Sequence, residues 1–268
     1  MTTPRQTDQQ SSASRTDSIV DIDLEESPFM SNGSSVIITI DGPAGTGKST
    51  VAHLLARRLG LDFLDTGAMY RAAALVAIEE DVDPSDGAAL AAAVARRDMH
   101  FDWGTDPPRL LLAEQDVSDR IRDLDVSGLV SVVAAQPELR SILVEQQRSI
   151  AQRHPRLVTE GRDQGSVVFP DAEVRFFLIA DEGVRAQRRV DQLRQKGKQV
   201  EHEEVQRDLR RRDELDASRP FDPLTRPEGA VDIDTSTLDA DGVVDAMEQV
   251  IRERLTDRSF RAASEGSA

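Results

Sequence analysis

An octapeptide near the N-terminus, Gly42 to Ser49, reads GPAGTGKS and fits the pattern G-x-x-x-x-G-K-S. Glycines at these spacings allow a tight turn in which successive backbone N–H groups point inward at an anion. The lysine can reach the β- and γ-phosphates of a nucleoside triphosphate, and the serine hydroxyl can ligate Mg²⁺. The loop follows an apolar run, 36–40, and precedes a helical pattern, so we interpret it as a phosphate-binding loop rather than a glycine-rich turn without function.

This interpretation predicts a bound nucleoside triphosphate with Mg²⁺ as its cofactor. The residues expected to bind the triphosphate are Gly42, Pro43, Ala44, Gly45, Thr46, Gly47, Lys48, Ser49 and Thr50. Ser49 is the expected metal ligand.

The loop does not reveal which group receives the γ-phosphate. A regulatory GTPase needs an Asn-Lys-x-Asp motif, and the only asparagine of the chain is Asn32, so that class is excluded. A kinase with a phosphorylated acceptor must bring two anions together and stabilise the charge on the moving phosphoryl group, which requires arginines from several elements. Arg71 and Arg162 each follow a predicted strand. Further arginines lie in two dense runs, which could also be solvated helix faces: Arg185, Arg188, Arg189, Arg210, Arg211, Arg212 and Arg219.

Short apolar runs alternate with helical patterns through most of the chain. The predicted strands are 36–40, 61–64, 157–160, 174–180 and 231–234, and the clearest helices are 49–59, 68–80 and 242–255. This alternation predicts an α/β fold of three layers, α/β/α, around a five-stranded parallel sheet, with ligands at the carboxyl ends of the strands. A hairpin pattern, 100–112, interrupts it and indicates an insertion over 93–133, unless it is a surface excursion without function.

The composition of the chain limits the partners and the location that we expect for the protein. The 268 residues are 38% hydrophobic, include no cysteine and carry a net charge of −16, which disfavours general binding to nucleic acid. No apolar run approaches the roughly 18 residues of a membrane span. We expect a cytoplasmic protein without membrane or nucleic-acid partners, with disordered tails at 1–34 and 257–268 around a core of 35–92 and 134–256.

Several motifs, taken in order, resemble bacterial cytidylate kinases. Besides the phosphate-binding loop they are DTGAMYR at 65–71, EGRDQGSVVFP at 160–170, the Arg188-Arg189 pair, and RRD at 211–213 with Asp216 and Arg219. The resemblance extends from about residue 36 to 255. It implies a nucleoside monophosphate kinase with a monophosphate-binding insertion and an arginine lid at about 183–200, monomeric, transferring phosphate from ATP to CMP or dCMP.

The resemblance also implies residue roles. The acceptor phosphate would be held by Thr66, Arg71, Arg162 and Arg219, and cytosine would be recognised by Ser131, Arg140 and Asp163. The sugar hydroxyls would be bound by Arg212 and Asp216, and the triphosphate would be covered by Arg185, Arg188 and Arg189. The catalytic residues would be Lys48, Arg71, Arg162 and Arg188. Asp163 could accept a hydrogen bond from the cytosine amino group, where uracil presents a carbonyl.

Two positions depart from the family pattern. Glu160 stands where aspartate is frequent and could hold a Mg²⁺-bound water, and Thr66 stands where serine is common. Three alternatives stay open: the same fold with UMP, AMP or a small metabolite such as shikimate as acceptor, a nucleotide-binding module without transfer, and a structural role for the acidic N-terminal tail.

Overall fold

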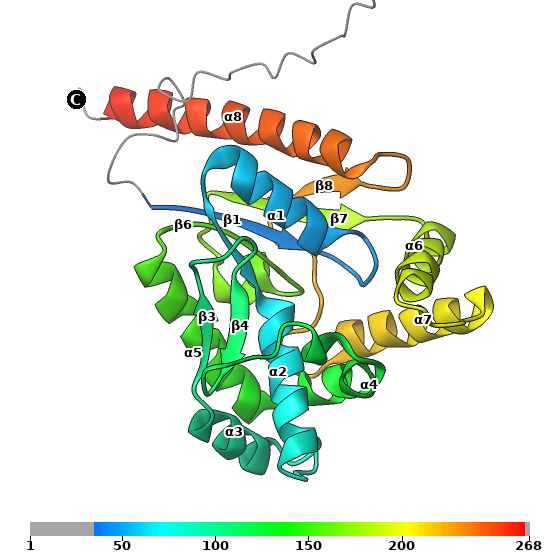
Figure 1. The fold of residues 1–268 in the computed structure, drawn as a ribbon. Coiled ribbons are helices and arrows are strands. Elements are labelled where there is room, and N and C mark those ends of the chain that lie inside the picture. The colour runs from blue at the N-terminus through cyan, green and yellow to red at the C-terminus, as the bar shows by residue number, and fades with distance from the viewer. Residues whose placement is uncertain (1–34, 266–268) are drawn as a thin grey trace, which may run out of the picture. The chain divides into compact units, whose positions relative to one another are not determined.

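The central sheet confirms the predicted five parallel strands. The computed structural model describes residues 35–265, so the predicted N-terminal tail lies outside the described residues. In spatial order the strands are β2 (Asp62–Asp65), β6 (Arg156–Gly161), β1 (Val36–Asp41), β7 (Val174–Ile179) and β8 (Val231–Asp234) (Figure 1). Ile38 and Ile40 of β1 are fully buried because this strand is central and covered on both faces.

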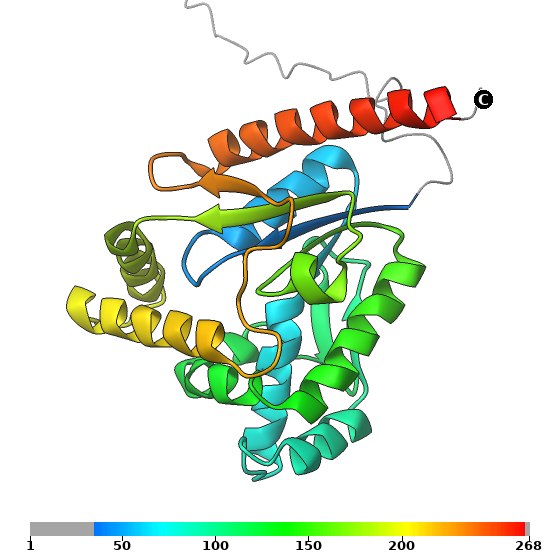
Figure 2. The same ribbon diagram turned by 180° about the vertical axis from the view of Figure 1, so that it is seen from behind.

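Helices form the outer layers. On one side α1 (Lys48–Leu59) packs against α8 (Ala240–Glu265) and β6. On the other side α2 (Thr66–Glu79) and α5 (Pro137–Arg153) pack together, and both lie below the sheet in Figures 1 and 2. The α/β/α prediction is confirmed.

Helix α8 is longer than predicted. The predicted helix ends at about residue 255, with a disordered tail at 257–268, whereas the helix in the structure continues to Glu265. The stretch 256–265 contains neither glycine nor proline and includes good helix formers, so nothing in it interrupts the helical hydrogen bonds.

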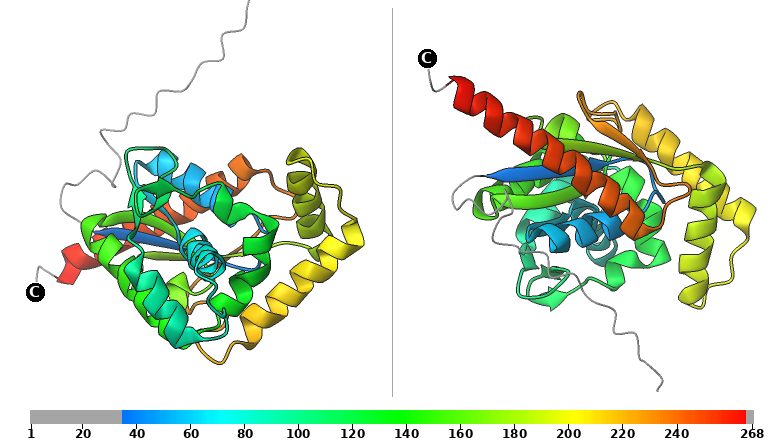
Figure 3. Two further views of the ribbon diagram at one scale, coloured as in Figure 1. Left: turned by 60° about the horizontal axis from the view of Figure 1, so that its bottom comes forward. Right: turned by 90° about the horizontal axis from the view of Figure 1, so that it is seen from above.

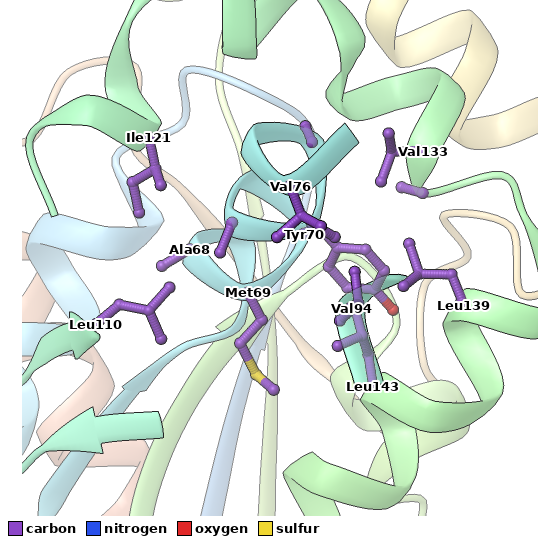
Figure 4. Close-up of a cluster of buried hydrophobic side chains, with 14 of the residues drawn as sticks. Ala68, Met69, Tyr70, Val76, Val94, Leu110, Ile121, Val133, Leu139 and Leu143 are labelled. Atoms are coloured by element: carbon purple, nitrogen blue, oxygen red, sulfur yellow. The ribbon is translucent and has the colours of Figure 1, made fainter. Parts of the chain in front are cut away.

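The predicted hairpin between the helical regions is present. Strands β3 (Met99–Asp102) and β4 (Arg109–Leu112) pair antiparallel, and β5 (Gln115–Asp116) adds a short third strand that the sequence analysis did not anticipate. Around this sheet stand α3 (Gly87–Arg96), the 3-10 turn η3 (Arg120–Arg122) and α4 (Leu124–Val133). Their apolar side chains join those of α2 and α5 in one core, in which Met69, Leu110, Ile121, Val133 and Leu139 are buried (Figure 4).

Two arginine-rich helices form a separate helical hairpin. They are α6 (Glu182–Gln195), which follows β7, and α7 (His202–Ser218), and they lie beside one another in both views of Figure 3. A small apolar cluster of their own holds them together: Ala186, Val190, Leu193, Val205 and Leu209. Among the described residues no helix is long and apolar enough to span a membrane.

Candidate active site

The phosphate-binding loop connects β1 to α1 and needs its glycines. Gly42 has a φ of 147°, and a Cβ there would stand 2.3 Å from the carbonyl oxygen of Leu178 in β7. Gly47, with a φ of 89°, is the N-cap of α1. Because the first N–H groups of a helix lack partners within it and carry partial positive charge, the start of α1 faces the loop as a site for an anion.

Lys48 is buried beside this loop. Its Nζ donates to the carbonyl oxygen of Pro43 at 2.7 Å, and Thr46 Oγ1 donates to the same oxygen at 3.1 Å. Burial, with the charge of Arg162 adding to it, lowers the pKa of the Lys48 ammonium below its usual range. An anion bound in the loop would favour the charged form, so this lysine is suited to a phosphate.

Ser49 and Glu160 bring two oxygen ligands together. The Ser49 hydroxyl, in the first turn of α1, donates to Glu160 Oε1 at 2.6 Å, and Glu160 lies near the end of β6 in register with Ile40 and Asp65. Burial, followed by the negative charge of Asp65, raises the pKa of Glu160. A hydroxyl and a carboxylate are the hard oxygen donors that Mg²⁺ prefers, so these residues fit the expected metal.

One cavity, of about 310 Å³, lies at the carboxyl ends of the strands and joins the loop to most of the predicted residues. That volume is in the range of small-molecule sites. The predicted residues that line it are Ala44, Gly45, Gly47, Lys48, Ser49, Thr50, Thr66, Arg71, Ser131, Arg140, Glu160, Arg162, Asp163, Arg189, Arg212, Asp216 and Arg219. The predicted residues that do not line it are Gly42, Pro43, Thr46, Arg185 and Arg188.

Arginines from α2, α6 and α7 and from the turn after β6 converge on this cavity. Arg71 of α2 donates to Ser127 Oγ at 2.8 Å, Arg162 donates from Nε to Asp216 at 2.9 Å, and Arg212 of α7 donates to the carbonyl oxygen of Ser127 at 3.1 Å. Burial lowers the pKa of Arg71 to about 10, with the charge of Arg212 contributing, and it also lowers the pKa values of Arg212 and Arg189. Cations that are buried near one another are unfavourable alone, so the cluster is suited to a polyanion.

Thr66, the first residue of α2, is linked to the backbone of Glu160. Its Oγ1 donates to the carbonyl oxygen of Glu160 at 2.7 Å. Asp65 caps the same helix by accepting from the N–H of Ala68 at 2.9 Å. The hydroxyl that distinguishes Thr66 from an apolar residue is therefore used, and its methyl is accommodated in a buried position.

At the far end of the cavity Arg140 of α5 forms an ion pair with Asp163, and each residue is at most 3% exposed. The Arg140 guanidinium lies over the ring of Tyr70, 5.6 Å from its centroid. Within the described residues the Tyr70 hydroxyl has no hydrogen-bond partner, although Tyr70 lines the cavity. A charged pair beside an aromatic ring can bind a planar base that carries both donors and acceptors.

The three predicted lid arginines have different surroundings. Arg185 is buried, forms an ion pair with Asp213 and donates to the carbonyl oxygen of Ala44 at 3.0 Å. Arg188 donates to Thr235 Oγ1 at 3.0 Å, after β8. Of the three, Arg189 alone lines the cavity, so in this conformation Arg185 and Arg188 support the loop and its neighbourhood instead of facing the site.

Sequence reasoning gave no role to several residues of the site. Asp213 accepts from the N–H of Ala44 at 3.1 Å, so α7 contacts the phosphate-binding loop directly. Asp41 ends β1 and accepts from the N–H groups of Gln164 and Gly165 at 2.8 and 2.7 Å, which fixes the π-helical turn η4 (Gln164–Val168) behind Asp163. The acidic residue directly before the glycine loop was the available signal for Asp41, whereas no sequence signal indicated that Asp213 reaches the loop.

Comparisons with known proteins agree with the geometry. Residues 38–253 match the family model described as cytidylate kinase. A cytidylate kinase of Caldanaerobacter subterraneus subsp. tengcongensis is 45% identical over 219 residues, which cover 82% of this chain and 96% of that protein. The cytidylate kinases of Nocardia farcinica and Geobacter sulfurreducens are 43% and 42% identical, covering 85% and 82% of this chain and 98% and 94% of theirs. The resemblance found in the sequence is confirmed: the chain belongs to the cytidylate kinase family.

Proposed function

We propose that the protein transfers the γ-phosphate of ATP to CMP or dCMP, giving ADP and CDP or dCDP. The observation that carries this proposal is the single cavity that joins Lys48 and Ser49 to a ring of arginines and to the buried Arg140–Asp163 pair. One end suits a triphosphate, the middle suits a second phosphate, and the far end suits a base. Family membership favours this reaction over the same fold acting on UMP, AMP or a small metabolite, and over a binding module without transfer.

The chemistry is direct in-line transfer without a covalent enzyme intermediate. The oxygen of the acceptor phosphate is ionised at neutral pH and needs no general base, so the residues position two anions and stabilise charge. Lys48 and the loop N–H groups hold the donor phosphates, and Arg71 and Arg162 hold the acceptor phosphate. Ser49 and Glu160 would hold Mg²⁺, Glu160 through a water, and the ion would neutralise charge on the transferred group.

The remaining roles are those that the family resemblance implies, and the residues that would bind the base, the sugar and the acceptor phosphate all line the cavity. Ser131, Arg140 and Asp163 read the cytosine edge, and Arg212 and Asp216 bind the sugar hydroxyls. Arg219 contributes to acceptor binding. Residues 93–133 form the monophosphate-binding insertion. The lid, at about 183–200, consists of α6 and the turn after it, and the separate apolar cluster between α6 and α7 supports it. Closure of the lid would bring Arg185 and Arg188 to the triphosphate together with Arg189, and would exclude water. A monomeric, cytoplasmic enzyme stays our prediction.

A coupled assay of ADP release tests this function. ATP is offered with CMP, dCMP, UMP, AMP or GMP, and release is compared with a sample that contains no acceptor. We expect release to depend strongly on CMP or dCMP. Equal release with and without these acceptors would contradict the kinase, and stronger release with UMP or AMP would contradict the assignment of cytosine.

A further inference from the structure

The loop between α7 and β8, residues 219–230, reaches the buried Arg140 from outside the cavity. Asp222 in this loop has a φ of 48°, in the left-handed region that residues other than glycine seldom adopt and that aspartate and asparagine tolerate best. The N–H of Leu224 donates to the carbonyl oxygen of Asp216 at 2.7 Å and closes the turn. The backbone at Asp222 is therefore held in an uncommon conformation that sets where its polar groups point.

Asp222 contacts two arginines of the site at once. Its carboxylate accepts from Arg140 Nε at 3.0 Å, and its carbonyl oxygen accepts from Arg219 Nη2 at 2.8 Å. Both arginines also donate to the carbonyl oxygen of Ala134, at 3.5 and 3.3 Å. Two buried guanidinium groups thus meet at one place, and burial together with the charge of Arg140 lowers the pKa of Arg219. The Asp222 carboxylate offsets this repulsion.

The contacts of Arg140 leave its guanidinium little freedom. Nε donates to Asp222, Nη1 to Ala134 and Nη2 to Asp163. Because the guanidinium is a rigid planar fork, fixing the Nε edge also fixes the direction of Nη2. The position of the Asp163 carboxylate, which lines the cavity, therefore depends on a second carboxylate, Asp222, that binds the same guanidinium.

Asp222 itself does not line the main cavity. It lines a second hollow on the outer side of Arg140, together with Phe221 and Arg148, and it is about one-third exposed. Its carboxylate reaches the cavity through Arg140, which is paired with Asp163, and its carbonyl oxygen reaches it through Arg219.

We propose that Asp222 is a positioning residue for base selectivity, which holds Arg140 against Asp163 from outside the cavity. This inference rests on the proposed function, because it presumes that the Arg140–Asp163 pair reads the base. The loop also contacts Arg219, so Asp222 binds both an arginine at the base end of the acceptor site and an arginine at its phosphate end.

Two substitutions distinguish the effect of the Asp222 carboxylate from the effect of the backbone conformation at this position. Asp222→Gly removes the side chain but accepts a φ of 48° without strain. Asp222→Asn also tolerates this conformation and keeps an oxygen that can accept from Arg140, but it removes the charge. Asp232→Asn is the matched control, because Asp232 pairs with Arg226 at 2.7 Å, both are about half exposed, and neither lines the main cavity.

The measured quantities are the ratio of kcat/KM for CMP to that for UMP, the KM for ATP, and the affinity for CMP by calorimetry without ATP. We expect Asp222→Gly to lower the CMP-to-UMP ratio and weaken CMP binding by about tenfold, as for loss of a charge-assisted hydrogen bond at a partly exposed group. The KM for ATP stays within about twofold, since the donor end is untouched. Asp222→Asn recovers part of the selectivity, and Asp232→Asn matches the wild type.

Selectivity and CMP affinity within twofold of the wild type in a folded Asp222→Gly protein would overturn the proposal. If the glycine variant does not fold, Asp222→Asn decides, and wild-type selectivity in it would likewise overturn the role of the charge. An equal rise in the KM values for ATP and CMP would show a general structural effect and would also count against it. A wild type that neither binds nor phosphorylates a pyrimidine monophosphate would reject the proposed function itself, which is a distinguishable result.

Discussion

Replacing Asp163 by asparagine isolates base recognition from the chemistry of transfer. The side chain keeps its size, so the cavity keeps its shape, but the carboxylate becomes an amide. We expect the amide oxygen to remain toward Arg140, which leaves the amide NH₂ toward the base. That group can donate to the O4 carbonyl of uracil but cannot accept from the N4 amino group of cytosine.

The magnitude follows from burial. Asp163 is 3% exposed, so a hydrogen bond from the cytosine amino group to its carboxylate is formed away from water. Hydrogen bonds to charged groups contribute about 1.5–3 kcal/mol, which corresponds to a loss of about 10- to 150-fold in kcat/KM for CMP. Arg140 retains the Asp222 carboxylate at 3.0 Å, so the guanidinium is not left without a counter-charge.

The assay compares kcat/KM for CMP and UMP in the wild type and in Asp163→Asn, with thermal unfolding as a check on folding. The ratio of CMP to UMP should fall by at least tenfold, with a KM for ATP that changes little. If the ratio is unchanged while the protein folds and turns over, Asp163 does not read the base and the orientation of the acceptor is wrong.

Three further outcomes follow from the same cavity. Lys48→Ala should lower kcat by at least about a hundredfold, because a preorganised charge at the donor phosphates is lost, and near-normal turnover in a folded variant would reject this role. Arg162→Ala should lower acceptor-dependent turnover by about a hundredfold with little change in ATP affinity, measured by ADP release and by nucleotide titration, and an unchanged acceptor KM and kcat would count against it. Burial and the charge of Asp65 raise the pKa of Glu160 in the free enzyme, and its ionised form is the one that holds the metal water. Because kcat/KM reports the groups of the free enzyme, kcat/KM should fall with decreasing pH at a higher pH than an ordinary glutamate titrates. In Glu160→Gln that acid limb should disappear from the pH profile, and an identical limb in this variant would assign it to another group.

Local pattern was sufficient to predict the fold. Buried β-branched runs such as 36–40 gave the strands, and the glycine loop between a strand and a helix gave the donor half of the site, because both depend on short-range geometry. The acceptor residues required the family resemblance, since Arg71, Arg140 and Arg212 meet only through the tertiary fold.

The contacts that could not be predicted from the sequence either join residues far apart in the chain or depend on a single backbone angle. Asp213 accepts from the N–H of Ala44, 169 positions away, and the RRD motif to which it belongs does not indicate that it contacts the phosphate-binding loop. Asp222 acts through a left-handed φ in a proline-flanked turn, which pattern reasoning does not resolve. The family resemblance predicted Arg188 as catalytic from an Arg-Arg pair, yet its direction toward Thr235 depends on where β8 ends, which the pair does not indicate.

The central claim is that one cavity holds the donor and acceptor phosphates in line. Titration with a bisubstrate analogue, adenosine and cytidine joined through five phosphates, tests it most directly. We predict one analogue per chain, an affinity higher than that of ATP or CMP alone, and competition with both substrates. An analogue that binds no more tightly than ATP, or that competes with ATP but leaves CMP binding unchanged, would contradict a shared cavity.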